Sequence, residues 1–501
     1  MPLPPSTRSG LPRRRACALY GVAGTRSGAR VRGLQNLFIR HLYMDFNKIK
    51  KIHFIGLGGI GVSAIAKYFL HQGSKVSGSD VHQSDLTEEL ENRGVRVFYN
   101  HNEINVPADA QLVIYSPAVP PENPERAKAE EMGVLTLSYP EFLGRFSANK
   151  KTIAIAGTNG KSTTTAMIGS IMAEAGLDPT VIVGTLTPGF DGNLRVGKTD
   201  WLVVEACEWK AHMLNLSPQI IVLTDLVPDH LDFYKNIDDL KRHFQQFIDK
   251  LPLEKGLLAF NADDENLRNL VKEKGYEVLN WGVLNKEVNN LAEEIKVENR
   301  EQIFKSDKTI FKLVIPGVYN VYNALAAITV ARYLKIKDEV TAKALGEFKG
   351  SWRRFELLGG LKGCKDVLVI SDYAHHPKAL KGVLKAAKEF YPERRLVAVF
   401  QPHHYDRTFK LFNEFKESFH GADLVIVNEI YDVAGREKDG ERQVSSADLV
   451  EAIKKAIPAK EVVYSADLNE TGEIIKKEVK AGDLVLMIGA GDIDELARKL
   501  I

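Results

Sequence analysis

Two glycine-rich segments of this chain have the residue types that bind phosphate groups. The first follows the apolar run KIHFI and spells G-x-G-x-x-G with Gly56, Gly58 and Gly61. The second, GTNGKS, follows the run TIAIA and ends in Lys161 and Ser162. In each case a strand-like run leads through glycines into a helix-like stretch, which offers the backbone N–H groups of a helix N-terminus to an anion. The sequence therefore predicts two phosphate-binding loops in one chain.

The first loop alone predicts a dinucleotide-binding fold. Asp80 closes the next strand-like run, KVSGSD, close to the position where such a fold places the acid that binds a ribose. Ser116, Pro117 and Ala118 follow the run LVIY at another strand end, where α/β proteins bind their ligands. Taken without the rest of the chain, this loop fits an NAD-dependent oxidoreductase, a non-catalytic nucleotide sensor, or a tight turn with no ligand.

The second loop predicts an ATP site. A strict Walker sequence would have glycine where Ile155 stands, so the match is limited to G-x-x-G-K-S. The loop still supplies backbone N–H groups, a lysine for the β- and γ-phosphates, and the Ser162 hydroxyl for Mg²⁺. ATP is therefore the ligand we expect here.

Carboxylates at two later strand ends support a metal site beside this loop. Glu205 and Glu208 follow the run WLVV, and Asp229, His230 and Asp232 follow the run IIVLTDL. Carboxylate oxygens suit the Mg²⁺ of a nucleotide, while the added imidazole suggests a second metal position. A single histidine in a loop is as often structural, so His230 has two interpretations.

Charge is divided unevenly along the chain. The 501 residues include 67 Lys and Arg against 65 Asp and Glu, a formal charge of +2. The first 44 residues hold eight arginines and no lysine or acid, so the remainder carries −6. A mildly acidic body argues against a protein that binds nucleic acid through a broad basic face. The segment 1–44 has the composition of a targeting peptide, but the plainer interpretation is that the functional protein begins at Met44.

The cysteines and the apolar runs exclude two further classes of protein. Cys17, Cys207 and Cys364 lie far apart and form no C-x-x-C pair, which supports neither a disulfide framework nor a zinc knuckle and fits a reducing cytosol. No apolar run approaches the roughly 20 residues of a membrane span, so we expect no membrane insertion.

The alternation of patterns predicts the fold class. Short Val/Ile/Leu-rich runs such as LVAVF and DLVIV are typical of strands buried on both faces, and amphipathic stretches such as HPKALKGVLKAAKEF lie between them. This pattern predicts an α/β protein with mostly parallel sheets. We expect domain boundaries near residues 146–150 and 346–350, and a small antiparallel insertion over 288–315.

Seven motifs in the order of one known family connect these observations. They are GTNGKSTTT, VVEACE, TDLVPDHLDFY, GVYNVYNALAA, SWRRFE, SDYAHHP and FQPHHYDRT. In this order they resemble the Mur ligases, and the resemblance covers the chain from Met44 to Ile501. SDYAHHP and FQPHHYDRT are its most specific parts, because they are similar to the branch that joins L-alanine to UDP-N-acetylmuramate.

The resemblance implies three domains after the extension 1–44. These are a Rossmann-like UDP-sugar domain at 45–147, a central P-loop ATPase domain at 148–347 and a C-terminal Rossmann-like α/β domain at 348–501 that binds the amino acid. One phosphate-binding loop would then hold the diphosphate of the UDP-sugar and the other the triphosphate of ATP.

The same resemblance implies an ATP-dependent amide ligase of peptidoglycan precursor synthesis. Such an enzyme forms an acyl phosphate on UDP-N-acetylmuramate, and L-alanine then displaces phosphate. It would be a cytoplasmic monomer or weak homodimer that uses Mg²⁺, with Mn²⁺ as a substitute, and would bind neither nucleic acid nor membrane. The nearest alternative is a murein-peptide ligase, which attaches a recycled tripeptide to the same sugar nucleotide.

The family motifs assign roles to residues in four sites. ATP is held by Gly157, Thr158, Asn159, Gly160, Lys161, Ser162, Thr163, Asn320, Asn323 and Arg354. The UDP-sugar is held by Gly58, Gly59, Ile60, Ser79, Asp80, Ser116, Pro117 and Ala118. The amino acid and acyl phosphate face Tyr373, His375, His376, His403 and Arg407. Metal ions bind Ser162, Glu205 and His230, and direct catalytic roles go to Lys161, His230, His375 and Arg407.

The chain departs from the pattern of that branch at several positions. Asn159 and Tyr319 stand where the branch has histidines, and His404 stands where it commonly has arginine. EACEWKAHML replaces an acidic segment and introduces Cys207, Lys210 and His212. We find no counterpart of the carbamylated lysine of some Mur ligases.

Overall fold

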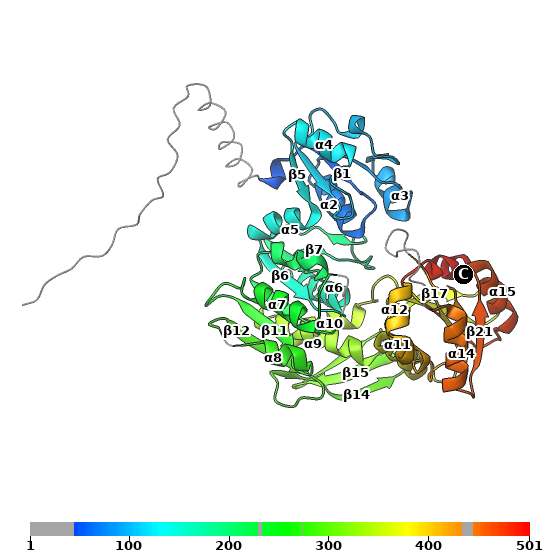
Figure 1. Cartoon of the computed structure of the whole chain (residues 1–501). Coiled ribbons are helices and arrows are strands. Elements are labelled where there is room, and N and C mark those ends of the chain that lie inside the picture. The colour runs from blue at the N-terminus through cyan, green and yellow to red at the C-terminus, as the bar shows by residue number, and fades with distance from the viewer. Residues whose placement is uncertain (1–44, 229–232, 273, 433–443) are drawn as a thin grey trace, which may run out of the picture. The chain divides into compact units, whose positions relative to one another are not determined.

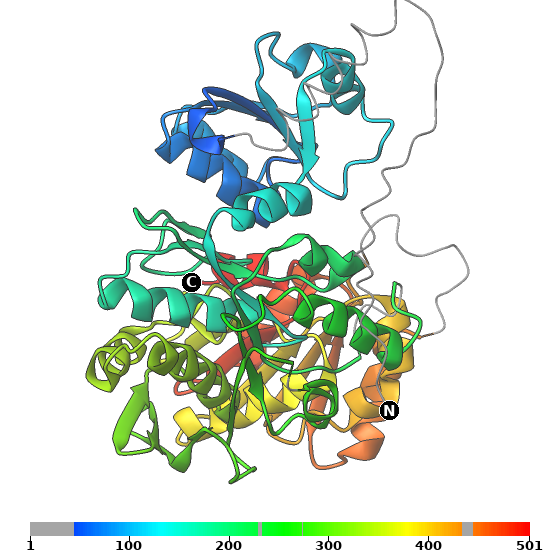
Figure 2. The same ribbon diagram turned by 90° about the vertical axis from the view of Figure 1, so that its left-hand side faces the viewer.

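The computed structural model describes residues 45–228, 233–272, 274–432 and 444–501. The expected N-terminal extension 1–44 lies outside them. A short 3₁₀ helix, η1 (Phe46–Lys48), precedes the first strand. Three large sheets follow in chain order, and because each is built from one continuous stretch of chain, each has its own range of colour in Figures 1 and 2.

The first sheet has five parallel strands in the order β3-β2-β1-β4-β5. Its strands are β1 (Lys51–Ile55), β2 (Lys75–Ser79), β3 (Arg96–Phe98), β4 (Leu112–Tyr115) and β5 (Leu135–Ser138). The connections hold α2 (Ile60–His71), α3 (Asp85–Asn92), η2 (Glu103–Asn105) and α4 (Pro124–Glu131), and α5 (Tyr139–Ala148) leads on to the second sheet.

The strand order brings the loops after β1 and β4 together. β1 lies between β2 and β4, so the strand order reverses at β1. The connections that follow β1 and β4 therefore lie on opposite faces of the sheet and form a crevice, which is the usual ligand position in open α/β sheets. A Cβ built on Gly56 would lie 2.8 Å from the Cβ of Ser116. Only glycine therefore allows this close approach, and the first phosphate-binding loop adjoins the segment 116–118.

The second sheet has eight strands in the order β13-β12-β11-β10-β6-β9-β7-β8, parallel except for the pair β7–β8. They are β6 (Lys151–Ala156), β7 (Thr180–Ile182), β8 (Leu194–Arg195), β9 (Trp201–Glu205), β10 (Ile220–Leu223), β11 (Leu257–Asn261), β12 (Glu277–Gly282) and β13 (Asn290–Leu291). Its helices are α6 (Lys161–Glu174), η3 (Trp209–Asn215), α7 (Ile237–Ile248), α8 (Glu265–Leu270), α9 (Val318–Tyr333) and α10 (Asp338–Glu347).

A single apolar core supports the start of α6. Met167 and Ile171 of α6 pack with Leu325 and Ile328 of α9 and with the buried strand residue Val222. These side chains are almost completely excluded from water, and burial of one such side chain contributes about 1.5–3 kcal/mol. The first turn of α6, which carries the second phosphate-binding loop, is thereby fixed against the sheet.

The expected antiparallel insertion is present. It consists of β14 (Glu293–Glu298), β15 (Glu301–Ser306) and β16 (Thr309–Leu313), paired in that order. Phe304 and Phe311 stack with ring centroids 5.5 Å apart and belong to the same core as α6 and α9.

The third sheet has six strands in the order β17-β18-β22-β19-β20-β21, parallel except for β17–β18. The strands are β17 (Glu356–Gly360), β18 (Leu368–Asp372), β19 (Leu396–Phe400), β20 (Leu424–Asn428), β21 (Glu461–Ser465) and β22 (Leu484–Ile488). Its helices are α11 (Pro377–Phe390), α12 (Tyr405–Lys410), α13 (Phe412–Lys416), α14 (Ser446–Ala456), α15 (Leu468–Glu478) and α16 (Ile493–Lys499).

The expected α/β class with mostly parallel sheets is confirmed. Helices α5 and α10 end at Ala148 and Glu347, next to the two domain boundaries expected from the sequence, which stay predictions. In the part of the chain that the structure describes, no helix is long and apolar enough to cross a membrane.

Candidate active site

The second phosphate-binding loop connects β6 to α6. Gly160 has a φ of 84°, and a Cβ at this position would collide with the Oδ1 of Asn323. The helix begins directly afterwards at Lys161, and no side chain among the described residues caps its first turn. The backbone N–H groups of that turn are therefore left for an anion, as the sequence predicts.

Lys161 is held inside this loop by oxygen atoms. Its Nζ donates to the carbonyl of Gly157 at 2.6 Å and to that of Thr158 at 3.2 Å, and it lies 2.9 Å from Oε1 of Glu208. Burial alone would lower the pKa of Lys161, but the negative charge of Glu208 raises it above its usual value. The lysine is thus a fixed positive charge at the loop.

Two of the three expected metal ligands lie together beside Lys161. The carboxylate of Glu205 accepts from the N–H of Gly184 and lies close to Ser162. Burial raises the pKa of Glu205, although the Gly184 N–H, the charge of Lys161 and the Ser162 hydroxyl oppose that effect. The third expected ligand, His230, lies outside the described residues.

The hydroxyl and carboxylate oxygens at this position fit a Mg²⁺ ion that takes few ligands from the protein. No group of three or more His, Cys, Asp or Glu residues that could hold a metal ion is found in residues 45–228, 233–272, 274–432 and 444–501. Magnesium commonly takes only one or two protein ligands and keeps water or substrate phosphate in its other positions. A hydroxyl and a carboxylate at the first turn of a phosphate-binding helix meet that requirement.

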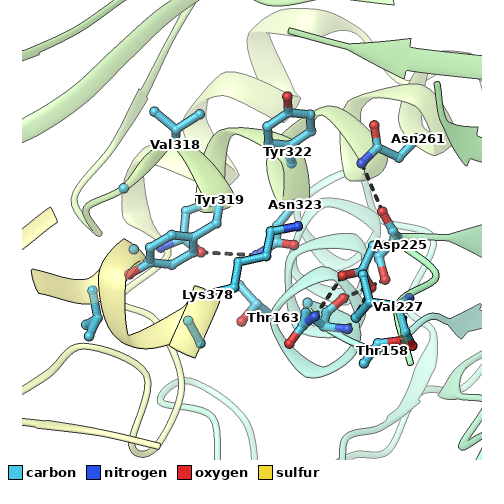
Figure 3. A pocket seen from close by; sticks show the side chains of 18 of the residues that line it. Thr158, Thr163, Asp225, Val227, Asn261, Val318, Tyr319, Tyr322, Asn323 and Lys378 are labelled. Atoms are coloured by element: carbon cyan, nitrogen blue, oxygen red, sulfur yellow. Dashed lines mark hydrogen bonds between the residues drawn. The ribbon is translucent and has the colours of Figure 1, made fainter. Parts of the chain in front are cut away.

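A cavity of about 790 Å³ extends from the second loop to the third sheet. Every expected ATP-binding residue except Gly157 lines it, and so do His375 and His376. Figure 3 shows Tyr319 and Lys378 on one side of this cavity and Asp225 and Thr158 on the other. The cavity therefore unites the predicted nucleotide site with part of the predicted amino-acid site.

Part of the cavity lining is aromatic or apolar. Trp281, Leu284 and Tyr322 belong to it, and the Tyr322 hydroxyl donates to Asp263 at 2.7 Å. Leu284 is 77% exposed. A flat aromatic ring suits such side chains, so this lining fits the base of a nucleotide.

Asn320 and Asn323 bond mainly to their own helix and its neighbours. Asn320 Nδ2 donates to the carbonyl of Pro316 at 2.7 Å, and Asn323 Nδ2 donates to Oδ1 of Asn320 at 3.1 Å. The hydroxyl of Thr164 on α6 donates to Oδ1 of Asn323 at 3.3 Å. The two amides thus join α9 to the second loop, and their expected contact with adenine stays a prediction.

The expected amino-acid residues gather on the loops after β18 and β19. The ring of His375 lies 5.2 Å from that of Tyr373 and 6.2 Å from that of His403, measured between centroids. Arg407 Nη1 lies 3.4 Å from Nδ1 of His403. His376 accepts from the N–H of Lys378 and caps α11. The two sequence motifs that carry these residues therefore form one cluster.

The protonation of His375 follows from its hydrogen bond. Nδ1 lies 2.9 Å from the carbonyl oxygen of Tyr373, which can only accept, so Nδ1 carries the proton. In the neutral imidazole the lone pair then lies on Nε2. His375 therefore offers a proton acceptor in the cluster.

Arginines connect this cluster to the nucleotide cavity. The guanidinium groups of Arg353 and Arg354 each lie 5.0 Å from the centre of the Tyr373 ring, and Arg354 lines the cavity. Arg353 instead donates to the carbonyl of Gly491 at 2.9 Å in the loop after β22.

In the first loop, the acid expected at the ribose supports the glycines. Oδ2 of Asp80 accepts from the N–H of Gly58 at 2.8 Å. The buried Ser79 hydroxyl donates to Glu125 at 2.7 Å. Gly58, Gly59 and Ile60 follow β1, and the segment 116–118 follows its parallel neighbour β4 at the same sheet edge, while the Ser79 side chain is fully buried. The assignment of these residues to a UDP-sugar stays a prediction.

Sequence reasoning missed several residues that line the cavity. Asp225 is the most informative, because its two carboxylate oxygens accept from the N–H and from Nδ2 of Asn159, both at 2.7 Å. Its position at the end of the run IIVLTDL was a usable signal. Trp281 and Leu284 carry no motif, because an aromatic or apolar residue in or after a strand is typical of any core, and Tyr322 lies in the motif GVYNVYNALAA but was given no role.

Comparisons with known proteins agree with this arrangement. Three family models match successive parts of the chain, the Mur ligase family catalytic domain at residues 51–151, the Mur ligase middle domain at 155–331 and the Mur ligase glutamate ligase domain at 353–491. A UDP-N-acetylmuramate–L-alanine ligase of Sulfurihydrogenibium sp. is 38% identical over 454 residues, which cover 90% of this chain and 97% of that protein. This chain belongs to the Mur ligase family.

Solved structures of Mur ligases have the same fold. The crystal structure of a UDP-N-acetylmuramate-alanine ligase from Thermotoga maritima matches with a TM-score of 0.76 and 30% identity, over 90% of this chain and 98% of that one. A murein peptide ligase from Psychrobacter arcticus matches with a TM-score of 0.65 and 23% identity, over 90% and 98%, and supports the fold alone. The expected three-domain Mur ligase architecture is confirmed.

Two departures of this Mur ligase from its branch have local explanations. Asn159 is held by both oxygens of Asp225, so the loop is fixed without a histidine. The Tyr319 ring packs on Gly317, and it fits there because this glycine has no side chain: a Cβ would lie 2.4 Å from Cε1 of the ring. Nothing in the structure explains the replacement at His404, which has a φ of 69°.

Proposed function

We propose that this Mur ligase joins L-alanine to UDP-N-acetylmuramate with the hydrolysis of ATP to ADP and phosphate. The observation that carries the proposal is the cavity that Lys161 and His375 line together, because it places a phosphate-binding lysine and a proton acceptor in one space. The relatives that bear this activity in their names support the choice of substrates.

The first step requires positive charge. The lactyl carboxylate of the sugar nucleotide attacks the γ-phosphorus of ATP, ADP leaves, and an acyl phosphate forms. Two anions must approach one another, so their repulsion is the main barrier that the protein can lower. Lys161 and Arg354 both line the cavity, and their positive charges lower this repulsion.

The second step requires a free amine. The ammonium group of L-alanine loses a proton, the amine attacks the acyl carbon, and phosphate leaves as the amide forms. Nε2 of His375 accepts that proton, while Arg407 binds the alanine carboxylate through two parallel N–H donors. His403 and Tyr373 position these two groups.

Magnesium would be held by Ser162, Glu205 and His230, with Mn²⁺ as a substitute. When bound, it neutralises charge on the β- and γ-phosphates of the nucleotide. The proximity of Ser162 to Glu205 supports this assignment.

The cellular location of the enzyme follows from its substrates. UDP-N-acetylmuramate is an intracellular precursor of peptidoglycan, so we place the enzyme in the cytoplasm, as a monomer or weak homodimer. Its product would supply cell-wall synthesis and hence cell shape and division.

The test is a product assay with the full chain. Incubation with ATP, Mg²⁺, UDP-N-acetylmuramate and L-alanine should give equal amounts of ADP, phosphate and UDP-N-acetylmuramoyl-L-alanine, measured by mass spectrometry. Omission of any one substrate should stop ADP formation. ADP formation without the amide product, or NAD reduction or oxidation in its place, would exclude the proposal.

A further inference from the structure

The segment 183–193, between β7 and β8, contacts residues beside both phosphate-binding loops. β7 and β8 are antiparallel neighbours in the second sheet. Beyond this pairing, the N–H of Val183 donates to the carbonyl of Asn193 at 3.0 Å. The two ends of the segment are therefore held against each other.

The first end of the segment holds the carboxylate of Glu205. The N–H of Gly184 donates to Oε1 of Glu205. A Cβ on Gly184 would lie 2.8 Å from Oε2, so a larger residue would push the carboxylate away. Because Glu205 lies beside Ser162 of the second loop, this end of the segment is fixed to that loop.

The second end of the segment holds the start of α2, which follows the first loop. Nδ2 of Asn193 donates to the carbonyl of Ile60 and to Oγ of Ser63, the latter at 2.9 Å. Ile60 is the first residue of α2 and comes directly after Gly58 and Gly59. A carbonyl oxygen can only accept, so the NH₂ end of the Asn193 amide must face it, and the orientation of this side chain is fixed.

The amide of Asn193 is only half satisfied. Its side chain is completely buried, and Oδ1 has no hydrogen-bond partner among the residues that the structure describes. A buried carbonyl oxygen without a partner destabilises a folded protein. The buried Asn290 differs, because it donates to Thr329 at 3.1 Å and also accepts from Arg332. Stability of the fold alone is therefore a poor reason for an asparagine at position 193.

Charged side chains hold the same segment on α2 and α3. Lys67 of α2 is completely buried, and its Nζ donates to the carbonyl of Asp191 at 3.4 Å. A Cβ on Gly192 would lie 2.9 Å from this Nζ. Nη1 of Arg93 donates to the Asp191 carboxylate at 2.6 Å. Asn193 extends this contact surface to the residues directly after the first loop.

We propose that Asn193 is a positioning residue, which fixes the first phosphate-binding loop relative to Glu205 and the second loop. The proposal rests on the proposed function, in which a carboxylate of the sugar nucleotide held at the first loop must reach the nucleotide phosphates at the second. Hydrogen bonds lead without a break from Ile60 through Asn193 and the adjoining residues 183–184 to Glu205. A displacement of about 1 Å between reacting groups can lower a rate about 100-fold, so a contact remote from them can control the reaction.

The test compares variants at two buried asparagines of the full chain. Asn193→Ala removes both hydrogen bonds to α2, and Ser63→Ala removes one of them. Asn290→Ala is the matched control, because Asn290 is also buried but lies outside the segment 183–193 and does not line the cavity. Calorimetry measures the binding of UDP-N-acetylmuramate and of a non-hydrolysable ATP analogue, each alone. Steady-state assays with all substrates give kcat for ADP formation.

We expect kcat of Asn193→Ala to fall about 10- to 100-fold and that of Ser63→Ala to fall about 3- to 10-fold. Each ligand alone should bind within about threefold of wild type, because both loops keep their own N–H donors. Asn290→Ala should keep the kcat of wild type. It should nevertheless lower the melting temperature at least as much as Asn193→Ala does, since both ends of the Asn290 amide are bonded.

An unchanged kcat in Asn193→Ala would overturn the inference. An equal fall in Asn290→Ala would also do so, because it would indicate a general effect of lost stability, and so would a loss confined to the KM for UDP-N-acetylmuramate. If Asn193→Ala does not fold, an unchanged kcat in Ser63→Ala overturns the inference instead. Absence of amide formation by the wild type would count against the proposed function.

Discussion

Nζ of Lys161 lies 2.9 Å from Oε1 of Glu208, so the lysine of the second loop is paired with a carboxylate. Both side chains are largely buried, which makes the pair a fixed element of the loop. A nucleotide must compete with Glu208 for this charge, because the ammonium group has three donors and two of them reach the carbonyls of Gly157 and Thr158.

Replacement of Lys161 should abolish the first chemical step. In Lys161→Ala, ADP formation is expected to fall at least about 100-fold at every Mg²⁺ concentration, since one preorganised electrostatic contact commonly contributes that much. Lys343→Ala is the control, because Lys343 pairs with Glu174 at the surface. Recovery of Lys161→Ala at high Mg²⁺ would contradict a direct role at the phosphates.

Replacement of a metal ligand should have a different effect on activity from replacement of Lys161. In Glu205→Gln the half-saturating Mg²⁺ concentration is expected to rise about tenfold or more, while the rate at saturating Mg²⁺ recovers in part, because Ser162 still offers an oxygen. His230→Ala should show the same partial rescue by Mg²⁺ or Mn²⁺. Steady-state rates measured over a range of Mg²⁺ concentrations give the half-saturating concentration and the maximal rate of each variant. An unchanged Mg²⁺ dependence in either variant would remove that residue from the metal site.

Arg407 should control the affinity for the amino acid. In Arg407→Ala the KM for L-alanine is expected to rise about 10- to 100-fold, the loss of a two-point bond to a carboxylate, while the KM for ATP stays within about twofold. Arg407→Lys should recover only part of the loss, since an ammonium group cannot make the planar contact. An equal rise in both KM values would contradict this assignment.

Asp191 should give a pH-dependent contribution to stability. Arg93 Nη1 donates to Asp191 at 2.6 Å and lowers the pKa of that carboxyl to about 2, against the opposing effect of burial. A lowered folded-state pKa means stabilisation that is present above the unfolded value near pH 4 and is lost as the pH falls through about 2.

The corresponding variant is Asp191→Asn. It should lower the free energy of unfolding by about 1 kcal/mol at pH 7 and by less at pH 3. The value at pH 7 is small because the pair of Arg93 and Asp191 is partly exposed to solvent. Urea unfolding at the two pH values measures the difference. Asp200→Asn serves as the exposed control. A loss that is larger at pH 3 than at pH 7 would contradict the sign of this effect.

Much of the fold could be predicted because apolar runs in parallel sheets are continuous. β10, β19 and β22 are buried at every residue, and the runs that contain them stand out in the sequence. β3 and β21 are shorter or more exposed and hold charged residues, so their patterns are weak. The order of the strands was not predicted, since periodicity does not say which strands are neighbours.

The site was predictable only where a motif carries it. The loop Gly157–Ser162 and the cluster around His375 could be found, because glycines and histidines at fixed spacing are unusual. Asp225 lies in the motif TDLVPDHLDFY but was given no role, since its contact with Asn159 is made only by the fold. Such contacts depend on sheet topology rather than on local sequence.

The central claim is that L-alanine is the amino acid joined to UDP-N-acetylmuramate. The most direct measurement is kcat/KM for L-alanine and for the tripeptide L-alanyl-γ-D-glutamyl-diaminopimelate, with ATP and UDP-N-acetylmuramate saturating and ADP as the readout. We predict a higher value for L-alanine, with L-serine and glycine accepted at higher concentrations, because Arg407 and His375 suit a small zwitterion. A higher kcat/KM for the tripeptide would contradict the account and identify a ligase that recycles murein peptides.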